Sequence, residues 1–240
     1  HYIVPNSNGN GFTTKGNDAA INSDSSYSYV SWTWRAAPKF FDVVQYSGTG
    51  SQQSIAHNLG QVPGMIIHKR TDTNEDWRVY HRMANGGSSP EDYIIQLNGD
   101  DDFSNDNTNF GAPTSTHFVV KTSSGTNNSS GTYIAYLFGH DTSSDGMIQC
   151  GSYTGDGGSS NSVNLGFEPQ WVLIKAAASS TNRRWVILDN IRGIVSNGDD
   201  ERLEANYAGA AVNAGGITLT PSGFYLESNN EYNSNGATYI

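Results

Sequence analysis

The chain has 240 residues, of which 35% are hydrophobic and 15% are charged, and its formal net charge is -10. Only 13 residues are Lys or Arg, which argues against a nucleic-acid partner because phosphate binding needs a basic stripe. A single cysteine, Cys150, excludes an intramolecular disulfide framework. No apolar run reaches about 18 residues, so the sequence gives no sign of membrane insertion by a helix.

The first 40 residues contain two segments that match the end of a later repeat. Phe12 lies 106 residues before Phe118, in a similar local setting. Residues 28–34 alternate aromatic and small side chains, as in a strand with one buried side. We therefore predict that residues 1–40 are the closing part of a preceding repeat or an N-terminal arm.

Strand-like segments dominate residues 41–140. The run 65–69 is mostly apolar, as expected for a strand that is buried on both faces, and turns rich in Asn, Ser and Gly separate it from its neighbours. Residues 92–97 fit a helix or an edge strand equally well. About seven short strands in about 100 residues predict an all-β fold, an antiparallel and jelly-roll-like β-sandwich, with a partly closed barrel as the alternative.

The same pattern returns after residue 147, which predicts tandem repeats of about 106 residues. The spacing is 106 for the leucines, prolines, lysines and phenylalanines that match, and 108 for one tryptophan pair. These pairs are Leu59 and Leu165, Pro63 and Pro169, Lys69 and Lys175, Phe118 and Phe224, and Trp77 and Trp185. We predict one β-sandwich repeat at 41–140 and a second at 147–240.

The second repeat stops two residues into its last strand. Tyr239 and Ile240 match only the beginning of residues 133–138, so repeat 2 is predicted to lack its last strand. We therefore expect a segment of a longer chain. The alternative is an N-terminal arm followed by two complete domains.

One acidic run offers oxygen ligands for a metal ion. Asp100, Asp101 and Asp102 are consecutive, and Asp106 follows among asparagines, which suits Ca²⁺. The second repeat has its acidic run in a different frame, and the EF-hand pattern is absent. The alternative is a solvated acidic loop, and no other cofactor is expected.

Four tryptophans are candidates for stacking on sugars. Trp77 and Trp185 occupy equivalent places in the two repeats, and Trp32 and Trp34 lie in the strand-like segment near the start. Packing in the core is the first interpretation of such rings, and a sugar-stacking face is the alternative, because exposed aromatic rings beside Asn and Asp suit glycan binding.

No catalytic residues are predicted. The glycine-rich segments 46–50 and 153–157 lack the lysine and helix of a phosphate loop, so tight turns explain them better. The positions that recur in both repeats are Gly, Pro, aliphatic and aromatic, which are scaffold types. A carboxylate pair for glycoside hydrolysis stays open because it has no signature in the sequence.

Several segments together resemble a duplicated β-domain of uncharacterised marine-phage virion proteins of the tail fibre or tail-associated kind. These segments are 32–44, 46–50, 57–60, 65–69, 76–81 and 128–134. The resemblance covers nearly the whole chain. It implies a structural role in a virion and brings no catalytic residues with it.

We therefore expect a non-enzymatic virion structural protein, a tail fibre or appendage segment that contributes to assembly and to binding host-surface glycan. The expected location is the virion or the extracellular space, and the expected partners are other copies of the chain, for example in a trimer, and other virion proteins. The alternatives are a capsid decoration protein, an extracellular filament subunit whose missing strand comes from a neighbouring chain, and a secreted carbohydrate-binding module or polysaccharide-active enzyme.

Overall fold

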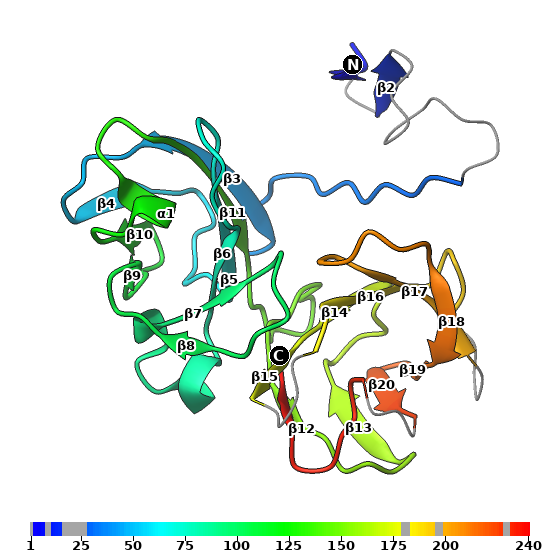
Figure 1. Ribbon diagram of the computed structural model, residues 1–240. Helices are drawn as coiled ribbons and strands as arrows, with labels where there is room; N and C mark the ends of the chain where they lie inside the picture. The colour runs from blue at the N-terminus through cyan, green and yellow to red at the C-terminus, as the bar shows by residue number, and fades with distance from the viewer. Residues whose placement is uncertain (1, 8–10, 16–27, 179–182, 195–198, 228–230) are drawn as a thin grey trace. The chain divides into compact units, whose positions relative to one another are not determined.

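The computed structural model describes residues 2–7, 11–15, 28–178, 183–194, 199–227 and 231–240 (Figure 1). They fall into two compact units, His1–Trp34 and Arg35–Ile240. Every strand pairing in the described residues is antiparallel, so the prediction of an all-β antiparallel fold is confirmed. Within this part of the chain, no helix is long and apolar enough to cross a membrane.

The smaller unit contains one hairpin. Its strands are β1 (Tyr2–Pro5) and β2 (Phe12–Lys15), with Pro5 opposite Phe12. Residues 16–27 of the predicted closing segment lie outside the described residues, and residues 28–36 belong to no strand or helix. The unit ends at Trp34 rather than at residue 40. Its derivation from a preceding repeat stays a prediction.

The larger unit opens with a six-stranded sheet in the order β3-β11-β5-β6-β7-β8. The strands are β3 (Phe41–Ser47), β11 (Thr132–Phe138), β5 (Met65–Arg70), β6 (Arg78–His81), β7 (Tyr93–Gln96) and β8 (Ser104–Asn105). The apolar strand β11 pairs with β3 along its whole length and with β5 along nearly all of it. Residues 92–97, which fitted a helix or a strand, contribute β7.

A smaller sheet packs against this one and makes a two-layer sandwich. Its strands are β4 (Gln53–Ala56), β10 (His117–Val120) and β9 (Phe110–Gly111), in the order β4-β10-β9. Buried side chains from both sheets form one core, which consists of Leu59, Ile66, Tyr80, Ile94, Phe110, Phe118, Val120, Ala135 and Leu137. Short helical turns complete the connections: η1 (Ala84–Gly87), η2 (Pro90–Asp92) and α1 (Ser124–Asn127).

The later part of the chain forms three smaller sheets, β12-β21-β15, β13-β20-β19 and β14-β16-β17-β18. The strands are β12 (Tyr153–Thr154), β13 (Asn161–Asn164), β14 (Trp171–Ile174), β15 (Ala176–Ala178), β16 (Val186–Asp189), β17 (Asp199–Glu204), β18 (Val212–Gly215), β19 (Ile217–Thr220), β20 (Gly223–Leu226) and β21 (Thr238–Tyr239). Their core consists of Ile174, Ala176, Val186, Leu188, Ile217, Phe224, Leu226, Tyr232, Ala237 and Tyr239.

Strands in the two halves pair in the same register at matching positions. The matching cross-strand pairs are Ile55 with Phe118 and Val163 with Phe224, then Ile66 with Tyr80 and Val172 with Leu188. The hairpin after β5 and its counterpart differ in length, and the change of spacing from 106 to 108 falls inside that loop. We call residues 41–140 repeat 1 and residues 147–240 repeat 2.

Two glycines in each glycine-rich segment are required by the backbone. A Cβ atom at Gly48 would lie 2.1 Å from the carbonyl oxygen of Asn128, and one at Gly155 would lie 2.2 Å from that of Ser234. Two residues later, the backbone has a φ of 72° in repeat 1 and 70° in repeat 2, which glycine adopts without strain. Close approach and turn geometry therefore account for these segments.

Replacing Gly155 by alanine should destabilise the fold by about 3 kcal/mol, because the new Cβ would collide with a backbone carbonyl that cannot move freely. Gly151→Ala is the matched control in the same repeat, since nothing lies within 4 Å of the Cβ position there. Thermal unfolding of both variants measures the difference. Equal melting temperatures would contradict the close approach.

Candidate functional site

The predicted metal ligands do not gather into a metal centre. Asp100 uses its backbone carbonyl, which accepts hydrogen bonds from Lys175 Nζ at 2.7 Å and from the backbone N–H of Arg183 at 3.1 Å. The carboxylate of Asp106 accepts hydrogen bonds from the N–H and the hydroxyl of Thr108, at 3.1 and 2.6 Å. In the described ranges, no three His, Cys, Asp or Glu side chains form a metal-holding group. Asp101 is exposed and Asp102 is half-buried.

The four candidate tryptophans differ in exposure. Trp185 is 1% exposed and donates its indole N–H to the carbonyl of Gln96 at 2.8 Å, so it lacks the free ring face that sugar stacking needs. We therefore remove Trp185 from the glycan candidates; it packs in the interior. Trp77 is half-buried and stacks on Tyr136 at 6.3 Å between ring centroids. Trp32 and Trp34 are half-buried and lie outside any strand.

One buried side chain holds together the loops at one end of repeat 1. The carboxamide oxygen of Asn127 accepts hydrogen bonds from the N–H of Thr49 and from Gln53 Nε2, both at 2.8 Å. Its Nδ2 donates to the carbonyl of Ser51 at 2.6 Å and to that of Lys121. Asn127 is fully buried, and a buried amide needs such partners because none of its polar atoms meets water.

The equivalent asparagine in repeat 2 makes the same kinds of bond. The Oδ1 of Asn233 accepts from the N–H of Asp156 and from Asn161 Nδ2, both at 3.0 Å, and its Nδ2 donates to the carbonyl of Gly158 at 2.7 Å. Asn127 and Asn233 are 106 residues apart. The sequence analysis missed both residues, although their spacing repeats, because they lie in turns full of Asn and Ser.

A stacked tyrosine pair lies beside each buried asparagine. Tyr46 and Tyr133 stack at 5.0 Å between ring centroids, and Tyr153 and Tyr239 stack at the same 5.0 Å. The hydroxyl of Tyr46 donates to the carbonyl of Thr126 at 2.7 Å. Burial raises the pKa of Tyr46 and of Tyr153 far above the ordinary value, so both phenols stay protonated and act as donors.

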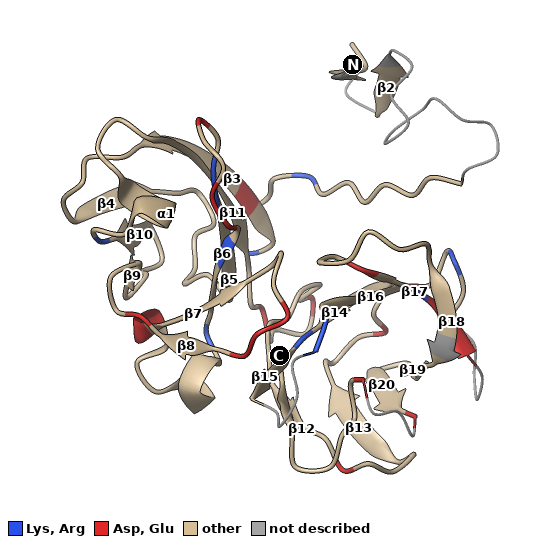
Figure 2. Cartoon of the chain, in the orientation of Figure 1, with Lys and Arg blue, Asp and Glu red and all other residues tan. Residues whose placement is uncertain are grey.

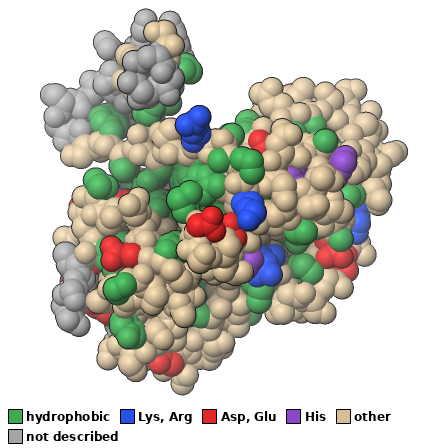
Figure 3. Space-filling view, turned by 180° about the vertical axis from the view of Figure 1, so that it is seen from behind, with side chains coloured by type: hydrophobic (Ala, Val, Ile, Leu, Met, Phe, Trp, Pro, Cys, Tyr) green, Lys and Arg blue, Asp and Glu red, His purple; other side chains and the backbone are tan. Residues whose placement is uncertain are grey.

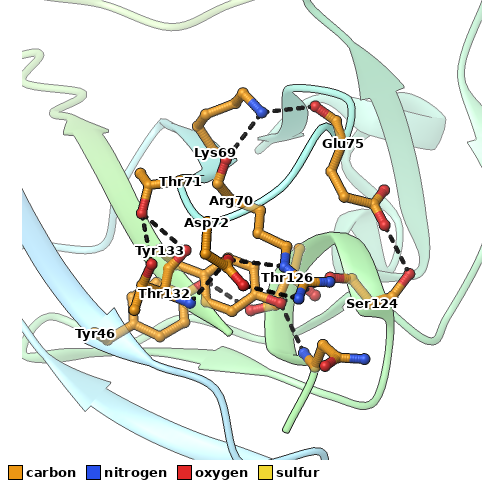
Figure 4. Close-up of polar contacts among 11 residues, drawn as sticks. Tyr46, Lys69, Arg70, Thr71, Asp72, Glu75, Ser124, Thr126, Thr132 and Tyr133 are labelled. Carbon is orange, nitrogen blue, oxygen red and sulfur yellow. Dashed lines mark hydrogen bonds and ion pairs between the residues drawn. The ribbon is translucent and has the colours of Figure 1, made fainter. Parts of the chain in front are cut away.

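Above this scaffold, repeat 1 carries a partly exposed polar group that we call the polar loop cluster (Figure 4). Its members come from the end of β5, the following loop, α1 and the start of β11: Arg70, Thr71, Asp72, Glu75, Ser124 and Thr132. Arg70 holds Asp72 in two parallel hydrogen bonds, from Nε at 2.9 Å and from a terminal nitrogen at 3.0 Å. Fork-to-fork bonding of this kind sets the orientation of both side chains.

The other members of the cluster are tied to each other or to the backbone. The hydroxyls of Thr71 and Thr132 are 2.8 Å apart, and Ser124 Oγ donates to Glu75 Oε1 at 3.2 Å. Lys69 links the end of β5 to the loop, because its Nζ donates a hydrogen bond to the carbonyl of Glu75 at 2.8 Å. The cluster is thus preorganised before any ligand arrives.

Asp72 is held in its charged form. The hydrogen bonds from Arg70, followed by the one from the N–H of Thr132, lower the pKa of Asp72 far below its ordinary value. At neutral pH this carboxylate accepts hydrogen bonds and has no proton to give, so it is unsuited to act as a general acid.

Repeat 2 has no counterpart of the Arg70 and Asp72 pair. The equivalent positions, 106 residues later, are Ala176, Ala177 and Ala178 on β15. The buried asparagine and the stacked tyrosines therefore recur, while the residues above them change from a partly exposed polar group to alanines, of which Ala176 and Ala177 are buried. This site was not predicted, because a bidentate pair two residues apart depends on how the hairpin bends.

Charge is dispersed over the described surface. In Figure 2, Lys and Arg lie singly or in short pairs along the strands and loops, and in Figure 3 charged side chains of both signs are interspersed with polar and hydrophobic ones. Neither view has a continuous basic stripe, so these faces offer no support for a phosphate-binding groove.

The family model of a domain of unknown function, DUF7483, matches residues 2–240. The chain belongs to the DUF7483 family. The comparisons with curated proteins and with solved structures give no match. Membership of the DUF7483 family does not indicate a function. Any inference about function therefore depends on the geometry of the site.

Replacing Asn127 by alanine should cost this DUF7483 domain about 3 kcal/mol of unfolding free energy, because several buried polar groups would lose their partners at once. Asn107→Ala is the control, since Asn107 is exposed and lies in the same repeat. Denaturant unfolding of both variants gives the comparison. Equal unfolding free energies for the Asn127 and Asn107 variants would contradict a structural role for Asn127.

His68 should make repeat 1 less stable in acid. Burial lowers its pKa to about 3, whereas the unfolded chain takes up a proton near pH 6.5. Between these values the unfolded state binds more protons, so stability falls as pH decreases from about 6.5, by up to about 1.4 kcal/mol per pH unit. Burial likewise lowers the pKa of His81 to about 3, so that side chain adds a similar slope.

His68→Ile should remove one of these two slopes, because the equivalent residue in repeat 2 is the buried Ile174. Unfolding free energies of the wild type and the variant, measured from neutral pH down to mildly acidic pH, test this. An unchanged slope in the variant would show that His68 is not the buried group that titrates on unfolding.

Proposed function

We propose that this chain is a non-enzymatic structural and binding protein, a segment of a virion appendage such as a tail fibre. Its rigid β-scaffold presents loops that bind a hydroxyl-rich ligand on a host surface, namely a glycan. The observation that carries the proposal is the contrast between the two repeats. They share buried asparagines and stacked tyrosines, and they differ in the residues above these, which are polar in repeat 1 and alanines in repeat 2.

That contrast favours recognition over catalysis. Loops that carry recognition vary on a constant scaffold, whereas a reaction needs its chemical groups to be kept. Arg70 and Asp72 have only alanines at the equivalent places in repeat 2. A catalytic unit duplicated along the chain would be inactive in one of its two copies.

The polar loop cluster suits sugar hydroxyls. It offers a charged carboxylate as acceptor, a guanidinium and several hydroxyl groups, all within one exposed region (Figure 4). Trp77, half-exposed at the end of the same loop, adds an aromatic face with the ammonium group of Lys69 5.9 Å from its ring centroid. Polar groups arranged beside an aromatic ring match the alternating polar and apolar faces of a sugar ring.

The virion setting is supported by the sequence resemblance to phage tail-associated β-domains. A net charge of -10 and a duplicated scaffold without disulfides also suit a particle protein whose stability rests on buried surface. Detection of this chain by peptide mapping of purified phage particles would support the location. Failure to detect peptides of this chain, in particles whose coat proteins are mapped over most of their sequence, would contradict the virion location.

Changing Arg70, Thr71 and Asp72 together to alanine should weaken glycan binding while leaving the fold intact. Repeat 2 already folds with alanines at these places, which makes the triple variant a copy of a natural arrangement. We expect at least roughly tenfold weaker binding to bacterial surface polysaccharides on an array, equivalent to about 1.4 kcal/mol. The control is Lys39→Ala with Asp141→Ala, which removes an ion pair with N–O distance 3.8 Å and leaves the net charge unchanged.

Two results would overturn the binding proposal. One is equal binding by the triple variant and the control, which would place recognition elsewhere. The other is release of reducing ends from the polysaccharide that the wild type binds, which would make the protein a polysaccharide-active enzyme.

A further inference from the structure

At the end of β17 in repeat 2, two arginines share one carboxylate. Glu204 Oε2 accepts a hydrogen bond from Arg184 Nη1 at 2.6 Å, and Glu204 Oε1 lies 3.4 Å from Arg202 Nη2. The side chains of Glu204 and Arg202 are 7% and 9% exposed, whereas that of Arg184 is 42% exposed. The group therefore has a buried part, which fixes the carboxylate, and an accessible guanidinium at the surface.

An exposed aromatic ring lies against this guanidinium. The guanidinium carbon of Arg184 is 3.7 Å from the ring centroid of Tyr207. The chain turns after β17, where the N–H of Tyr207 donates to the carbonyl of Glu204 at 3.2 Å. Gly209 lets the ring approach the backbone, since a Cβ atom there would lie 2.2 Å from a ring carbon. The ring is thus held in place while Tyr207 remains 53% exposed.

We call Arg184, Arg202, Glu204 and Tyr207 the arginine cluster. Strands β7 and β17 correspond at a spacing of 108, because each pairs with its preceding strand in the same register. The other repeat has different residues at all four places, namely Asp76, Ile94, Gln96 and Gly99. The arginine cluster is therefore specific to repeat 2, as the polar loop cluster is specific to repeat 1.

Packing does not account for Arg202. It occupies the place of Ile94, which belongs to the core of repeat 1, and a buried guanidinium costs free energy unless its charge is paired. In the described part of the chain, its Nε and Nη1 are buried without a hydrogen-bond partner. Its ion pair is with Glu204. Arg202 therefore positions the Glu204 carboxylate and balances part of its negative charge.

The positive charge of Arg184 is only partly neutralised by its neighbours. The carboxylates that act on it are Glu204 and Glu231. Each is also close to a second arginine, because Glu204 pairs with Arg202 and Glu231 lies 3.9 Å from Arg183. Among the described residues, Arg184 donates a hydrogen bond from Nη1 alone, so its Nε and Nη2 are available to a ligand.

We propose that the arginine cluster binds a uronic acid residue of an acidic polysaccharide. Arg184 donates from Nε and Nη2 to the sugar carboxylate, a planar group that matches the guanidinium fork. The exposed part of the Tyr207 ring packs against the C–H groups of the sugar ring. The inference rests on the proposed glycan binding and adds a ligand class and a second site. The arginine cluster shares no residue with the polar loop cluster, so each site can be tested by itself.

Titration with oligosaccharides of galacturonic acid and of glucuronic acid tests the proposal. Their methyl esters are the ligand control, because they keep the sugar ring and lose the charge. We expect the wild type to bind at least one of the acids roughly tenfold more tightly than its ester, as for a hydrogen bond to a charged group. Salt at about 0.15 M, where the Debye length is about 8 Å, screens distant acidic residues of the protein.

Arg184→Gln should weaken binding of the acids roughly tenfold, because the charged donor fork is lost. Tyr207→Ala should weaken it as well, since the sugar ring loses its aromatic partner. Lys39→Gln is the matched control. It removes one positive charge from a side chain that is 58% exposed and lies outside the arginine cluster, and it should bind like the wild type.

Glu204→Gln separates a binding role from a purely structural one. Glutamine stands at the equivalent place in repeat 1, so the strand accepts it. If the ion pair served stability alone, loss of either partner would impair the protein in the same way. If Arg184 binds an anion, Glu204→Gln leaves it with more positive charge, and the variant should bind the acids at least as tightly as the wild type. Thermal unfolding of each variant verifies that it is folded.

Three results would contradict the proposal: equal binding of the acids and their esters, wild-type affinity in Arg184→Gln, or a Glu204→Gln variant as weak as Arg184→Gln. The two proposals fail separately. If the wild type binds neutral surface polysaccharides on the array but none of these acids, the acidic-sugar site alone is wrong. If it binds no polysaccharide of either kind, the proposed glycan binding is wrong as well.

Discussion

A buried carboxamide that joins several chain segments is the interaction on which each repeat depends. At the ends of the sheets the chain turns inward, and the backbone groups of those turns lose contact with water. Asn127 and Asn233 supply donors and acceptors to these groups from the interior, in matching geometry. Because buried backbone groups must be paired, the turns that the asparagine joins cannot move apart without leaving several of these groups unsatisfied.

The two repeats diverge at the strand end above these turns. Repeat 1 carries the bidentate Arg70 and Asp72 pair, whereas repeat 2 has a run of alanines, of which Ala176 and Ala177 are buried. An alanine side chain has no polar group that needs a partner, so either arrangement is compatible with the buried asparagine beneath it.

Alternating and apolar runs predicted the antiparallel all-β fold correctly because strand formation depends mainly on local pattern. For Trp185 the sequence left core packing and a sugar-stacking face open, and its burial beside the distant carbonyl of Gln96 favours packing. For Asp100 it left a metal ligand and a solvated loop open, and the backbone carbonyl makes the contact. Asn127 was visible in the repeat spacing but had no chemical signature in a turn rich in asparagine. The polar loop cluster could not be foreseen, since it joins residues about 60 positions apart, such as Asp72 and Thr132.

The hairpin that follows β5 differs in length between the repeats, yet the strands on either side keep their register. Ile66 still meets its partner across the hairpin as Val172 does in the later repeat, so the loop contributes nothing to strand alignment. Such a hairpin is a natural exchange point, where a new sequence can enter without disturbing the sheet beneath it. Insertions or replacements in this loop would therefore change the surface of the domain while the strand register beneath stays the same.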